Sequence, residues 1–254
     1  MNANETLLVT TAEGVATFTL NRSQARNALN SALCEALYAA CSGAAHDPSV
    51  RLVLIRAAGP VFCAGADLKE RQGMSEDAVR ARRLKAFAAY DAIERLPMPA
   101  IAVLEGPAVG SGCEIAGACD FIIATPAASF RVPEALWGTV GATQRLPRIL
   151  GKRLAKDLMF TGRTLSVIDA QIAGLVSRIV APEALDATLA AITQTVVGGP
   201  SAALALAKRS IDQGIELDPR GALAVELMAI EENLAKNDWR AGIAGFAERG
   251  AAKP

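Results

Sequence analysis

Two glutamates, Glu114 and Glu134, are the side chains best suited to acid–base chemistry in a chain that has only one histidine. Each follows a turn marked by glycine or proline, and each lies among apolar residues that would desolvate its carboxylate. Desolvation disfavours the charged form and can raise a carboxyl pKa toward neutrality, where the group serves as acid or base. A single glutamate is more often a surface or capping residue. A catalytic role is favoured here because two glutamates share an apolar setting and lie beside two loops that could present backbone donors.

The loop over residues 62–68 could present a backbone N–H group to a ligand. Gly65 allows the chain to turn sharply, and the alanines on either side leave the surface open. If Asp67 opens a helix, its carboxylate caps that helix and the N–H of Ala66 points outward as a fixed donor. The same residues also fit an ordinary strand-to-helix turn, which is common in α/β domains.

The segment over residues 106–114 has the same plan. Gly110, Ser111 and Gly112 follow an apolar run and precede another expected element. Two backbone donors that converge on one point, with water excluded, would stabilise an oxyanion as it develops. The two loops and the two glutamates therefore suggest parts of a single site.

The other reactive side chains favour structural interpretations. His46 lies at an expected helix end, and without a second histidine or a Gly-x-Ser-x-Gly elbow a serine-hydrolase triad is disfavoured. Cys63 and Cys113 have no nearby basic partner and are interpreted as small core residues. Four basic residues in the expected helix over 76–96 are interpreted as its solvated face. A nucleic-acid-binding site is the less favoured interpretation. This basic run comprises Arg80, Arg82, Arg83 and Lys85.

Composition narrows the class of protein. The chain has 254 residues, 52% of them hydrophobic, which suits one large domain or one domain with a helical appendage. Its 26 basic and 26 acidic residues balance, so a general polyanion-binding role is disfavoured. Five scattered cysteines without a Cys-x-x-Cys pair indicate reduced thiols in a cytosol-like compartment, and they are not spaced as metal ligands.

Neither the N-terminus nor the longest uncharged stretch predicts an export or membrane segment. Residues 1–5 are polar and lack the basic-then-apolar order of a signal peptide. The stretch 187–207 is interrupted by Gly198-Gly199-Pro200, which we interpret as the boundary between two helices and not as part of a membrane span. We therefore expect a cytoplasmic protein without a membrane partner.

Strands that alternate with helices, followed by a run of helices, predict an α/β fold with parallel pairing and a C-terminal helical part. The expected elements are a hairpin over residues 7–20, a helix beginning at Asn30-Ser31, buried strands at 52–55, 100–104 and 121–123, and a charged helix over 76–96. After Arg145 the pattern is mostly helical. It includes one apolar stripe, either core or a subunit contact, formed by Leu223, Leu227, Ile230 and Leu234.

Short segments from nearly the whole chain combine into a pattern that is far more specific than any one of them. They are Leu20-Asn21-Arg22, residues 26–30, 62–70 and 106–120, Pro133-Glu134, residues 143–148, Gly174-Leu175-Val176 and Ala207-Lys208. With this pattern the chain closely resembles the crotonase family, that is, the enoyl-CoA hydratase/isomerase superfamily. Residues 62–71 and 211–214 are most similar to its methylglutaconyl-CoA hydratase branch.

The resemblance implies a ClpP/crotonase-like α/β fold. In that fold, ββα units stack in a spiral, expected here over residues 1–195, and a helical C-terminal region, expected over 196–254, forms trimers. The resemblance also implies an acyl-CoA thioester as substrate and a homo-oligomer, either a trimer or a dimer of trimers. No metal or other cofactor is implied, since coenzyme A is part of the substrate, and a nucleic-acid partner is disfavoured.

The resemblance also assigns roles to residues. The N–H groups of Ala66 and Ser111 take the positions of an oxyanion hole for the thioester carbonyl. Glu114 matches the carboxylate that helps to activate water for attack at C3, and Glu134 matches the one that supplies a proton to C2. The positions expected to line the acyl-CoA path are Arg26, Ala28, Ala64, Ala66, Asp67, Leu68, Gly110, Ser111, Pro133 and Trp137. Phe246 is expected to reach a neighbouring subunit's ligand.

Two departures from the family pattern bear on the reaction. Ser111 stands where the family usually has glycine, which narrows the φ range and adds a hydroxyl. Residues 136–143 are shorter than the Pro-Gly-x-Gly-Gly passage that the family uses to help hold the attacking water. The unusual Trp137, beside Glu134, is expected to narrow the acyl pocket.

Three hypotheses follow. The first is an enoyl-CoA hydratase, because both carboxylates and both donor loops are present. The second is an isomerase that moves the double bond with a single carboxylate, which the shortened passage favours. The third is a catalytically impaired acyl-CoA or RNA binder, for which the basic run at 80–85 is the only support. Acyl-chain identity and the choice between trimer and hexamer stay open.

Overall fold

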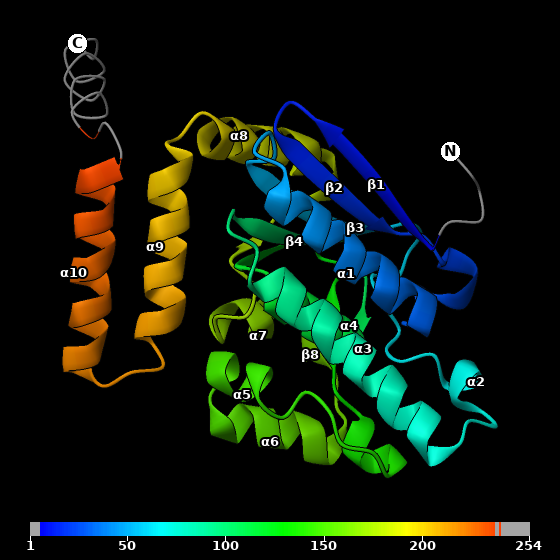
Figure 1. Ribbon diagram of the computed structural model, residues 1–254. Helices are drawn as coiled ribbons and strands as arrows, with labels where there is room; N and C mark the ends of the chain where they lie inside the picture. The colour runs from blue at the N-terminus through cyan, green and yellow to red at the C-terminus, as the bar shows by residue number, and fades with distance from the viewer. Residues whose placement is uncertain (1–5, 237–238, 240–254) are drawn as a thin grey trace.

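The larger of two β-sheets forms the frame on which the expected loops are mounted. The computed structural model describes residues 6–236 and 239 (Figure 1). Six strands lie in the order β1-β2-β3-β4-β6-β9. Their bounds are β1 (Leu7–Ala12), β2 (Val15–Leu20), β3 (Leu52–Ala57), β4 (Ala100–Leu104), β6 (Phe121–Ala124) and β9 (Arg178–Ile179). The β1–β2 pair is antiparallel and all other pairs in this sheet are parallel, so the expected hairpin and parallel pairing are confirmed.

The central strands of this sheet are buried on both faces. β4 is buried along its whole length, as are the first four residues of β3. Continuous apolar runs such as these suit parallel strands that are covered on both sides. One face packs against α1 (Ser31–His46), α3 (Glu76–Glu94) and α4 (Ser111–Ala118), and α8 (Leu185–Val197) covers the other with Leu185, Leu189 and Ile192.

A second, smaller sheet runs alongside the first and carries the loops. It contains β5 (Ala108–Val109), β7 (Ser129–Arg131) and β8 (Leu165–Ser166). Isolated parallel bridges between Leu29 and Ala66, and between Cys63 and Ala108, extend the same layer toward the N-terminus. Successive turns of the chain thus add a strand to the larger sheet and a short segment to the smaller one, which is the spiral of repeated units that the resemblance implied.

Helix boundaries follow the capping residues that the sequence contains. Asn30 accepts the N–H of Leu33 at 2.9 Å and begins α1, as expected. Asp67 accepts two N–H groups and begins the short α2 (Leu68–Arg71), and Ser75 caps α3. The remaining helices are α5 (Arg145–Leu150), α6 (Lys152–Thr161), α7 (Val167–Ile172), α9 (Ser201–Gly214) and α10 (Pro219–Lys236), with 3-10 turns at Ser23–Ala25 (η1), Glu134–Trp137 (η2) and Pro182–Ala184 (η3). Between Arg145 and Lys236 the chain is therefore mostly helical, interrupted by the two-residue strands β8 and β9.

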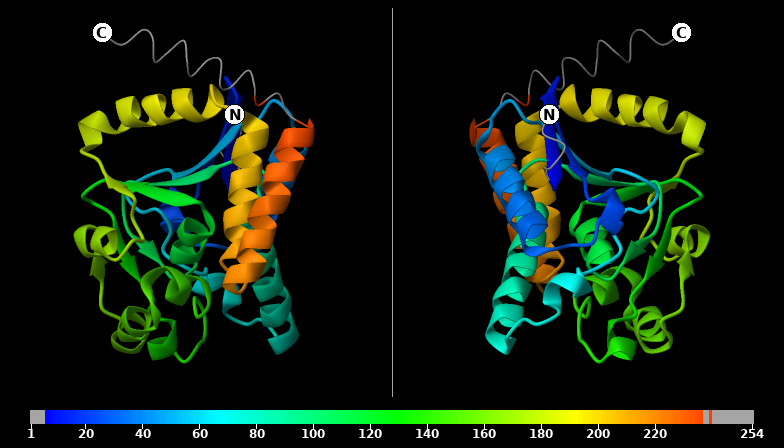
Figure 2. Two further views of the ribbon diagram at one scale, coloured as in Figure 1. Left: turned by 90° about the vertical axis from the view of Figure 1, so that its left-hand side faces the viewer. Right: turned by 90° about the vertical axis from the view of Figure 1, so that its right-hand side faces the viewer.

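Helices α9 and α10 form a hairpin that stands beside the body of the protein (Figures 1 and 2). An ion pair of 2.9 Å between Lys208 Nζ and Asp120 Oδ1 ties α9 to the body. The expected domain boundary at residue 195 lies in the last turn of α8. The apolar stripe on α10 is about half exposed, so it is not core in this chain; it consists of Leu223, Leu227, Ile230 and Leu234.

Two sequence-based interpretations concern residues outside the site. Within the described residues no single helix is long and apolar enough to span a membrane. Residues 182–197 and 201–214 reach the required length and apolar composition only when they are taken together, and a bend of 99° separates them. Cys63 and Cys113 are buried, as expected for core residues, and so are the other three cysteines; burial raises the pKa of the Cys63 thiol to about 12. Phe246 lies outside the described residues.

Candidate active site

The N–H of Ala66 is directed away from the strand that holds it. Leu29 donates to the carbonyl of Gly65 at 2.8 Å and accepts the N–H of Asp67 at 2.9 Å. In a parallel bridge, the residue between those two contacts, here Ala66, turns its own N–H to the other side. Within residues 6–236 this N–H has no hydrogen-bond acceptor, so it is available to a ligand.

A buried asparagine, Asn27, hydrogen-bonds to the chain just before the loop that carries Ala66. Asn27 is fully buried, and its side-chain amide donates to the carbonyls of Ala58 and Val61 at 2.9 and 2.8 Å. The carboxylate of Asp67 caps α2 and pairs with Arg22 at 2.9 Å. These hydrogen bonds and the ion pair fix the backbone of the loop. They leave the N–H group of Ala66 exposed to the cavity.

The second donor is the N–H of Ser111, at the first position of α4. The first N–H groups of a helix have no intrahelical acceptor, and the preceding Gly110 provides no side-chain cap. Gly112 lets this helix end approach the other loop, since a Cβ there would lie only 2.5 Å from the carbonyl oxygen of Cys63. The start of α4 therefore packs directly on the strand that leads to Ala66.

Both donors line one cavity together with both glutamates. The cavity has a volume of about 70 Å³ and includes Ala66, Ser111, Glu114 and Glu134. One wall is a face of α3, and the opposite wall is the loop over residues 139–142. The α3 residues in this wall are Arg82, Arg83, Ala86, Phe87 and Tyr90. A larger cavity of about 530 Å³ adjoins it, sharing Glu114 and Phe87 and opening toward α5 and α9.

Glu114 is buried and held by an ion pair. It lies in the first turn of α4 and is 6% exposed. Arg145 of α5 pairs with its Oε2 and also with Glu94 Oε2, the latter at 2.5 Å. Burial raises the pKa of Glu114, and the Arg145 guanidinium opposes that shift without cancelling it. The sequence showed no cation near Glu114, and the structure supplies one from 31 residues away.

Glu134 is half-buried and rests against a glycine. It begins η2, and its carboxylate occupies the space that a side chain at position 110 would fill, because a Cβ on Gly110 would lie 2.2 Å from Oε1 of Glu134. Its Oε2 is buried and has no hydrogen-bond partner among the described residues. Burial is the main cause that raises the pKa of Glu134, and the nearby charge of Glu114 adds to it.

The hydroxyl of Ser111 has a partner of its own. It hydrogen-bonds with the phenol of Tyr90, a residue of α3 that is only 4% exposed, and burial raises the pKa of that phenol. The extra hydroxyl at this position is thus engaged with α3 while the backbone N–H remains at the cavity.

The shortened passage after η2 is held by an arginine. Arg83 Nη1 donates to the carbonyl of Val140, and Nη2 donates to Thr139 Oγ1, both at 2.7 Å. Ala142, which is buried and has a positive φ of 55°, closes this side of the cavity. The passage is therefore an ordered wall attached to α3, although it is short.

Most of the other residues expected along the acyl-CoA path lie near this cavity without lining it. Arg26, which is exposed, accepts the N–H of Ala64 at 3.0 Å, and Ala28 accepts a bond from Arg22. Leu68 is 55% exposed at the start of α2, and buried Pro133 directly precedes Glu134. These residues border the Ala66 loop or the Glu134 turn, and their part in binding stays a prediction.

Trp137 does not narrow the cavity as expected. Its side chain is 55% exposed and does not line either of the two cavities at Glu114. Glu134 at the start of η2 faces Gly110, whereas the wall of the cavity is formed after the turn, by Thr139, Val140 and Gly141. The aromatic residue that does line both cavities is Phe87 of α3.

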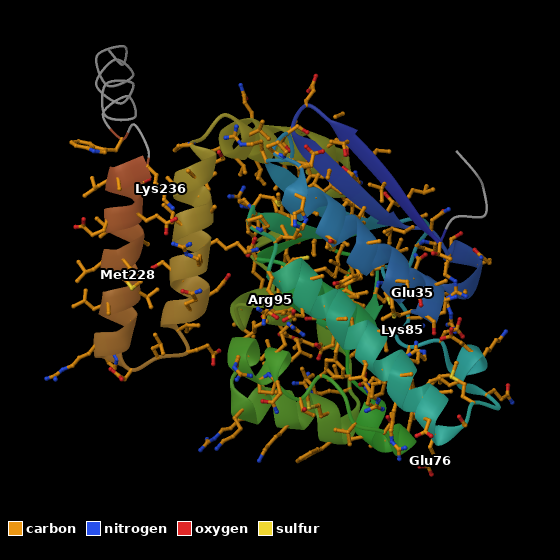
Figure 3. All side chains as sticks on the ribbon, in the orientation of Figure 1. Glu35, Glu76, Lys85, Arg95, Met228 and Lys236 are labelled. Atoms are coloured by element: carbon orange, nitrogen blue, oxygen red, sulfur yellow. The ribbon has the colours of Figure 1, made fainter. Side chains whose placement is uncertain are left out.

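The basic run of α3 does not form one solvated face. Arg82 is 5% exposed and pairs with Glu70 at 2.7 Å, so for this residue the interpretation was wrong. Arg80 pairs with Glu76 and Asp77 on the surface, and Lys85 pairs with Glu35 of α1 at 2.6 Å (Figure 3). These pairings, and the contact of Arg83 with the 139–140 loop, remove the only support for an RNA-binding role.

Sequence reasoning missed the residues that complete the site from other elements. Arg145 lay in the 143–148 segment of the family pattern, yet nothing local connected it to Glu114. Tyr90 follows Ala86 at helical spacing, which is the one signal that it faces inward. Arg83 was grouped with the exposed charges around it.

Comparisons with known proteins place the chain in one family. A family model described as enoyl-CoA hydratase/isomerase matches residues 10–253. A protein of Arabidopsis thaliana named probable enoyl-CoA hydratase 2, mitochondrial, is 39% identical over 241 residues, which cover 93% of this chain and 80% of that protein. A probable enoyl-CoA hydratase of Rhizobium meliloti is 37% identical, with 95% of each chain covered. The crystal structure of enoyl-CoA hydratase from Bacillus anthracis superimposes with a TM-score of 0.92 at 35% identity, covering 96% of each chain.

Proposed function

The chain belongs to the enoyl-CoA hydratase/isomerase family, and from this we propose that it is an enoyl-CoA hydratase. In this reaction water adds reversibly across the 2,3-double bond of an acyl-CoA thioester. The observation that carries the proposal is that one cavity is lined by two carboxyl groups of raised pKa and by two residues whose backbone N–H groups have no acceptor among the described residues. Each has a distinct task in the addition.

The N–H groups of Ala66 and Ser111 act on the thioester oxygen. Attack of water at C3 moves electron density onto this oxygen and produces an enolate. Donors that are fixed before the reaction stabilise the charge as it develops, and removal of one such donor typically costs ~10²–10³ in rate. Because both donors belong to the backbone, their positions depend on the Leu29 bridge and on the start of α4.

The two glutamates divide the proton transfers. Glu114, kept at least partly ionised by Arg145, accepts a proton from the attacking water. Glu134, which has no ion-pair partner among the described residues and has a raised pKa, is suited to the protonated form and donates its proton to C2. One proton is taken from water and one is delivered to carbon, so return of the proton from Glu114 to Glu134 restores the enzyme.

Substitution of each glutamate tests this assignment. With crotonyl-CoA as substrate, Glu114→Gln and Glu134→Gln should each lower kcat/KM by ~10²–10⁴, the usual contribution of a general acid or base. Glu105→Gln is the matched control, because Glu105 is a surface residue paired with Arg56 at 2.7 Å. Full activity in both site variants would end the hydratase assignment.

One observation favours a second reaction, migration of the double bond from the 3,4- to the 2,3-position. Within residues 6–236 Glu134 has no ion-pair partner, while Glu114 is bound to Arg145, so a single carboxyl group could shuttle the proton between C2 and C4. Incubation of a 3-enoyl-CoA with wild type and Glu114→Gln separates the two reactions. An isomerase forms the 2-enoyl product in both proteins, whereas a protein that only hydrates 2,3-double bonds leaves the 3-enoyl-CoA unchanged in both.

We also propose that the protein is a homo-oligomer, a trimer or a dimer of trimers, assembled through the α9–α10 hairpin. Its apolar residues border an open groove of about 790 Å³ that includes Leu223, Ile230 and Leu234. Exposed apolar surface of this kind is typical of subunit contacts. Light scattering should give a multimer for wild type and a smaller species for Leu223→Asp/Ile230→Asp, with Val9→Asp on the distant β1 as control. An unchanged mass in the double variant would contradict this proposal.

Three finer expectations stay predictions. They are a cytoplasmic location, the absence of a metal or redox cofactor, and membership of the methylglutaconyl-CoA hydratase branch. The relative from Arabidopsis is named as a mitochondrial protein, so a cytoplasmic location does not follow from family membership.

A further inference from the structure

Arg145, which pairs with Glu114, also holds a carboxylate that the addition of water does not require. Its Nη1 contacts Oε2 of Glu114, and its Nη2 contacts Oε2 of Glu94 at 2.5 Å. Glu94 is the last residue of α3, and its side chain is 51% exposed, whereas Glu114 is buried. Hydration assigns no task to Glu94, so its place beside the guanidinium group needs a separate explanation.

The guanidinium group of Arg145 is divided between the two carboxylates. An arginine can bind one carboxylate through two parallel hydrogen bonds, which is a strong and specific form of this ion pair. Here each carboxylate receives one Nη group through one oxygen atom, and the buried Nε of Arg145 has no hydrogen-bond partner among the described residues. Glu114 therefore receives only part of the stabilisation that a guanidinium group can give to an anion.

Helix α3 holds the guanidinium group in this divided orientation. Tyr90 and Glu94 are four residues apart and so lie on the same side of the helix. The ring centre of Tyr90 lies 6.0 Å from Cζ of Arg145, which is a cation–π contact, and Glu94 binds Nη2. Arg145 thus reaches Glu114 from α5, while two side chains of α3 fix its orientation.

Other titratable groups face Glu114 and Arg145 from several elements. Beside Arg145 they are Arg148 of α5, Asp212 of α9, and Glu216, which follows α9. In the smaller cavity they are Arg71 of α2, Arg82, Arg83 and Tyr90 of α3, and Glu134 of η2. The charges with the largest effect on Glu114 are those of Arg145 and Glu94: burial raises the pKa of Glu114, the guanidinium group opposes this shift, and the charge of Glu94 adds to it. Loss of Glu94 would therefore leave Arg145 to act on Glu114 without this opposition.

We propose that Glu94 is a positioning residue that shares the guanidinium group of Arg145 with Glu114, and that this sharing keeps Glu114 a stronger base toward water. The proposal rests on the proposed function, in which Glu114 accepts a proton from the attacking water. A general base works best when its pKa lies near the working pH, and an undivided guanidinium group would hold Glu114 too firmly as an anion. Burial and Arg145 act on Glu114 in opposite directions, and Glu94 adjusts the balance between them.

The pH profile of hydration tests this role. In Glu94→Gln the negative charge is lost and Arg145 acts on Glu114 alone, so the pKa of Glu114 should fall. Because Glu114 must be ionised to act, the acidic limb of the kcat/KM profile for crotonyl-CoA should move to lower pH, opposite to the effect of losing Arg145. Activity on that limb, divided by the plateau value, should rise about two- to fivefold, the range for one partly exposed charge. A limb that stays in place or moves to higher pH would overturn the proposal.

Two further variants show whether the particular charge of Glu94 is responsible. Glu94→Asp keeps the charge on a shorter side chain, so its acidic limb should lie between those of wild type and Glu94→Gln. Asp91→Asn is the matched control, because Asp91 lies one turn earlier on α3 with a similar exposed fraction of 56%, but pairs with Arg95 at 2.7 Å. Its acidic limb should not move. If Asp91→Asn moves the limb as far as Glu94→Gln does, the effect belongs to net charge and the proposal is wrong.

Combination with Arg145→Gln shows whether Glu94 acts through the arginine. The shift that Glu94→Gln causes should be smaller in the Arg145→Gln protein than in wild type, because residues in one ion-pair network do not contribute independently. Equal shifts in the two proteins would mean that Glu94 acts on Glu114 directly, and they would overturn the proposed sharing.

Titration of the carboxyl group without turnover separates the positioning role from the proposed reaction. In protein labelled with carbon-13 at the glutamate carboxyl carbons, the resonance that is lost in Glu114→Gln belongs to Glu114. Its titration midpoint should lie at lower pH in Glu94→Gln than in wild type. This shift in a protein that hydrates no enoyl-CoA would support the sharing of Arg145 while rejecting the hydratase. Hydration of crotonyl-CoA together with an unchanged Glu114 titration in Glu94→Gln would keep the hydratase and reject the positioning role.

Discussion

The two glutamates of the site have the same chemistry but are held in opposite ways. Glu114 lies on α4 within the core, is 6% exposed, and has an arginine as partner. Glu134 lies on a 3-10 turn followed by the 138–142 loop, and a buried oxygen of its carboxyl group has no partner among the described residues. Burial raises the pKa of both groups; Arg145 opposes the shift of Glu114 by charge and hydrogen bond, whereas Arg83 opposes that of Glu134 by its charge alone and as the last of the causes.

This difference shows how one residue type can supply both an acid and a base. The cation at Glu114 favours the ionised form, which suits a base, and the isolation of Glu134 favours the protonated form, which suits an acid. The position of Glu114 depends on an attractive contact, whereas that of Glu134 depends on the absence of a side chain at Gly110. The two regions should therefore respond differently to substitution.

The largest effect is expected at Gly110, which should disable the Glu134 region and leave Glu114 in place. In Gly110→Ala the new Cβ would lie 2.2 Å from Oε1 of Glu134, at a φ of +49° that is strained for alanine. The carboxyl group must move out of the cavity, and kcat/KM for hydration should fall ~10²–10⁴, as for loss of a general acid. The measurement is steady-state hydration of crotonyl-CoA, together with a crystal structure of the variant.

A second glycine provides the control for this substitution. Gly43 lies in α1, and a Cβ there would meet nothing within 4 Å, so Gly43→Ala should keep full activity and gain about 0.5–1 kcal/mol in unfolding free energy. Hydration at the wild-type rate by Gly110→Ala would show that Glu134 does not act from the observed position.

The next effect concerns the Glu114 region and appears as a pH shift. Arg145 lowers the pKa of Glu114 against the larger effect of burial, so Arg145→Gln should raise that pKa further. A base must be ionised to act, and the acidic limb of the kcat/KM profile should therefore move to higher pH. For a shift of one pKa unit, activity on that limb falls about tenfold.

Arg148 on the same helix is the control for Arg145. It is exposed and pairs with Glu216 at 3.1 Å, so Arg148→Gln should leave the pH profile unchanged. A profile for Arg145→Gln that superimposes on that of wild type, in a folded protein, would mean that Glu114 is not the group that titrates on the acidic limb.

The contrast between the two regions also explains what could be predicted from the sequence. The caps at Asn30 and Asp67, the apolar strands and both glycine loops are local features, and each lies where the sequence indicated. The pairing of Arg145 with Glu114 spans 31 residues and depends on how α5 packs against α4. Turn chemistry is encoded within a few residues, whereas such a contact is a property of the assembled layers.

Arg82 and Trp137 are two residues whose burial could not be predicted from residue type. Arg82 belongs to a charged run that reads as surface, but Glu70 and the Leu29 carbonyl satisfy it in the interior. Trp137 is a large aromatic residue close to a catalytic candidate, yet it faces solvent. Residue type gives the usual environment of a side chain, and tertiary contacts decide the exceptions.

A smaller effect is expected from Ser111, on the Glu114 side of the comparison. The proposed donor is its backbone N–H, and its hydroxyl is engaged with Tyr90. Ser111→Gly keeps the donor and loses only one hydrogen bond, so kcat/KM for hydration should change by no more than about tenfold. A loss as large as that of Gly110→Ala would assign the hydroxyl, in place of the N–H, to the reaction.

The smallest effect should come from Trp137, and a matched pair of aromatic residues makes the test sharp. Trp137 and Phe87 are similarly exposed, at 55% and 52%, but only Phe87 lines the two cavities at Glu114. Trp137→Ala should alter kcat/KM by less than about twofold across enoyl-CoA substrates of increasing chain length, as is usual for a surface change. Phe87→Ala should change the chain-length preference, because it removes part of the wall and its edge-on contact with Tyr90, whose ring centre lies 5.9 Å away. The reverse outcome would be a chain-length preference that changes in Trp137→Ala and not in Phe87→Ala. It would mean that the acyl chain binds on the outer side of η2, near Glu134, and not against α3.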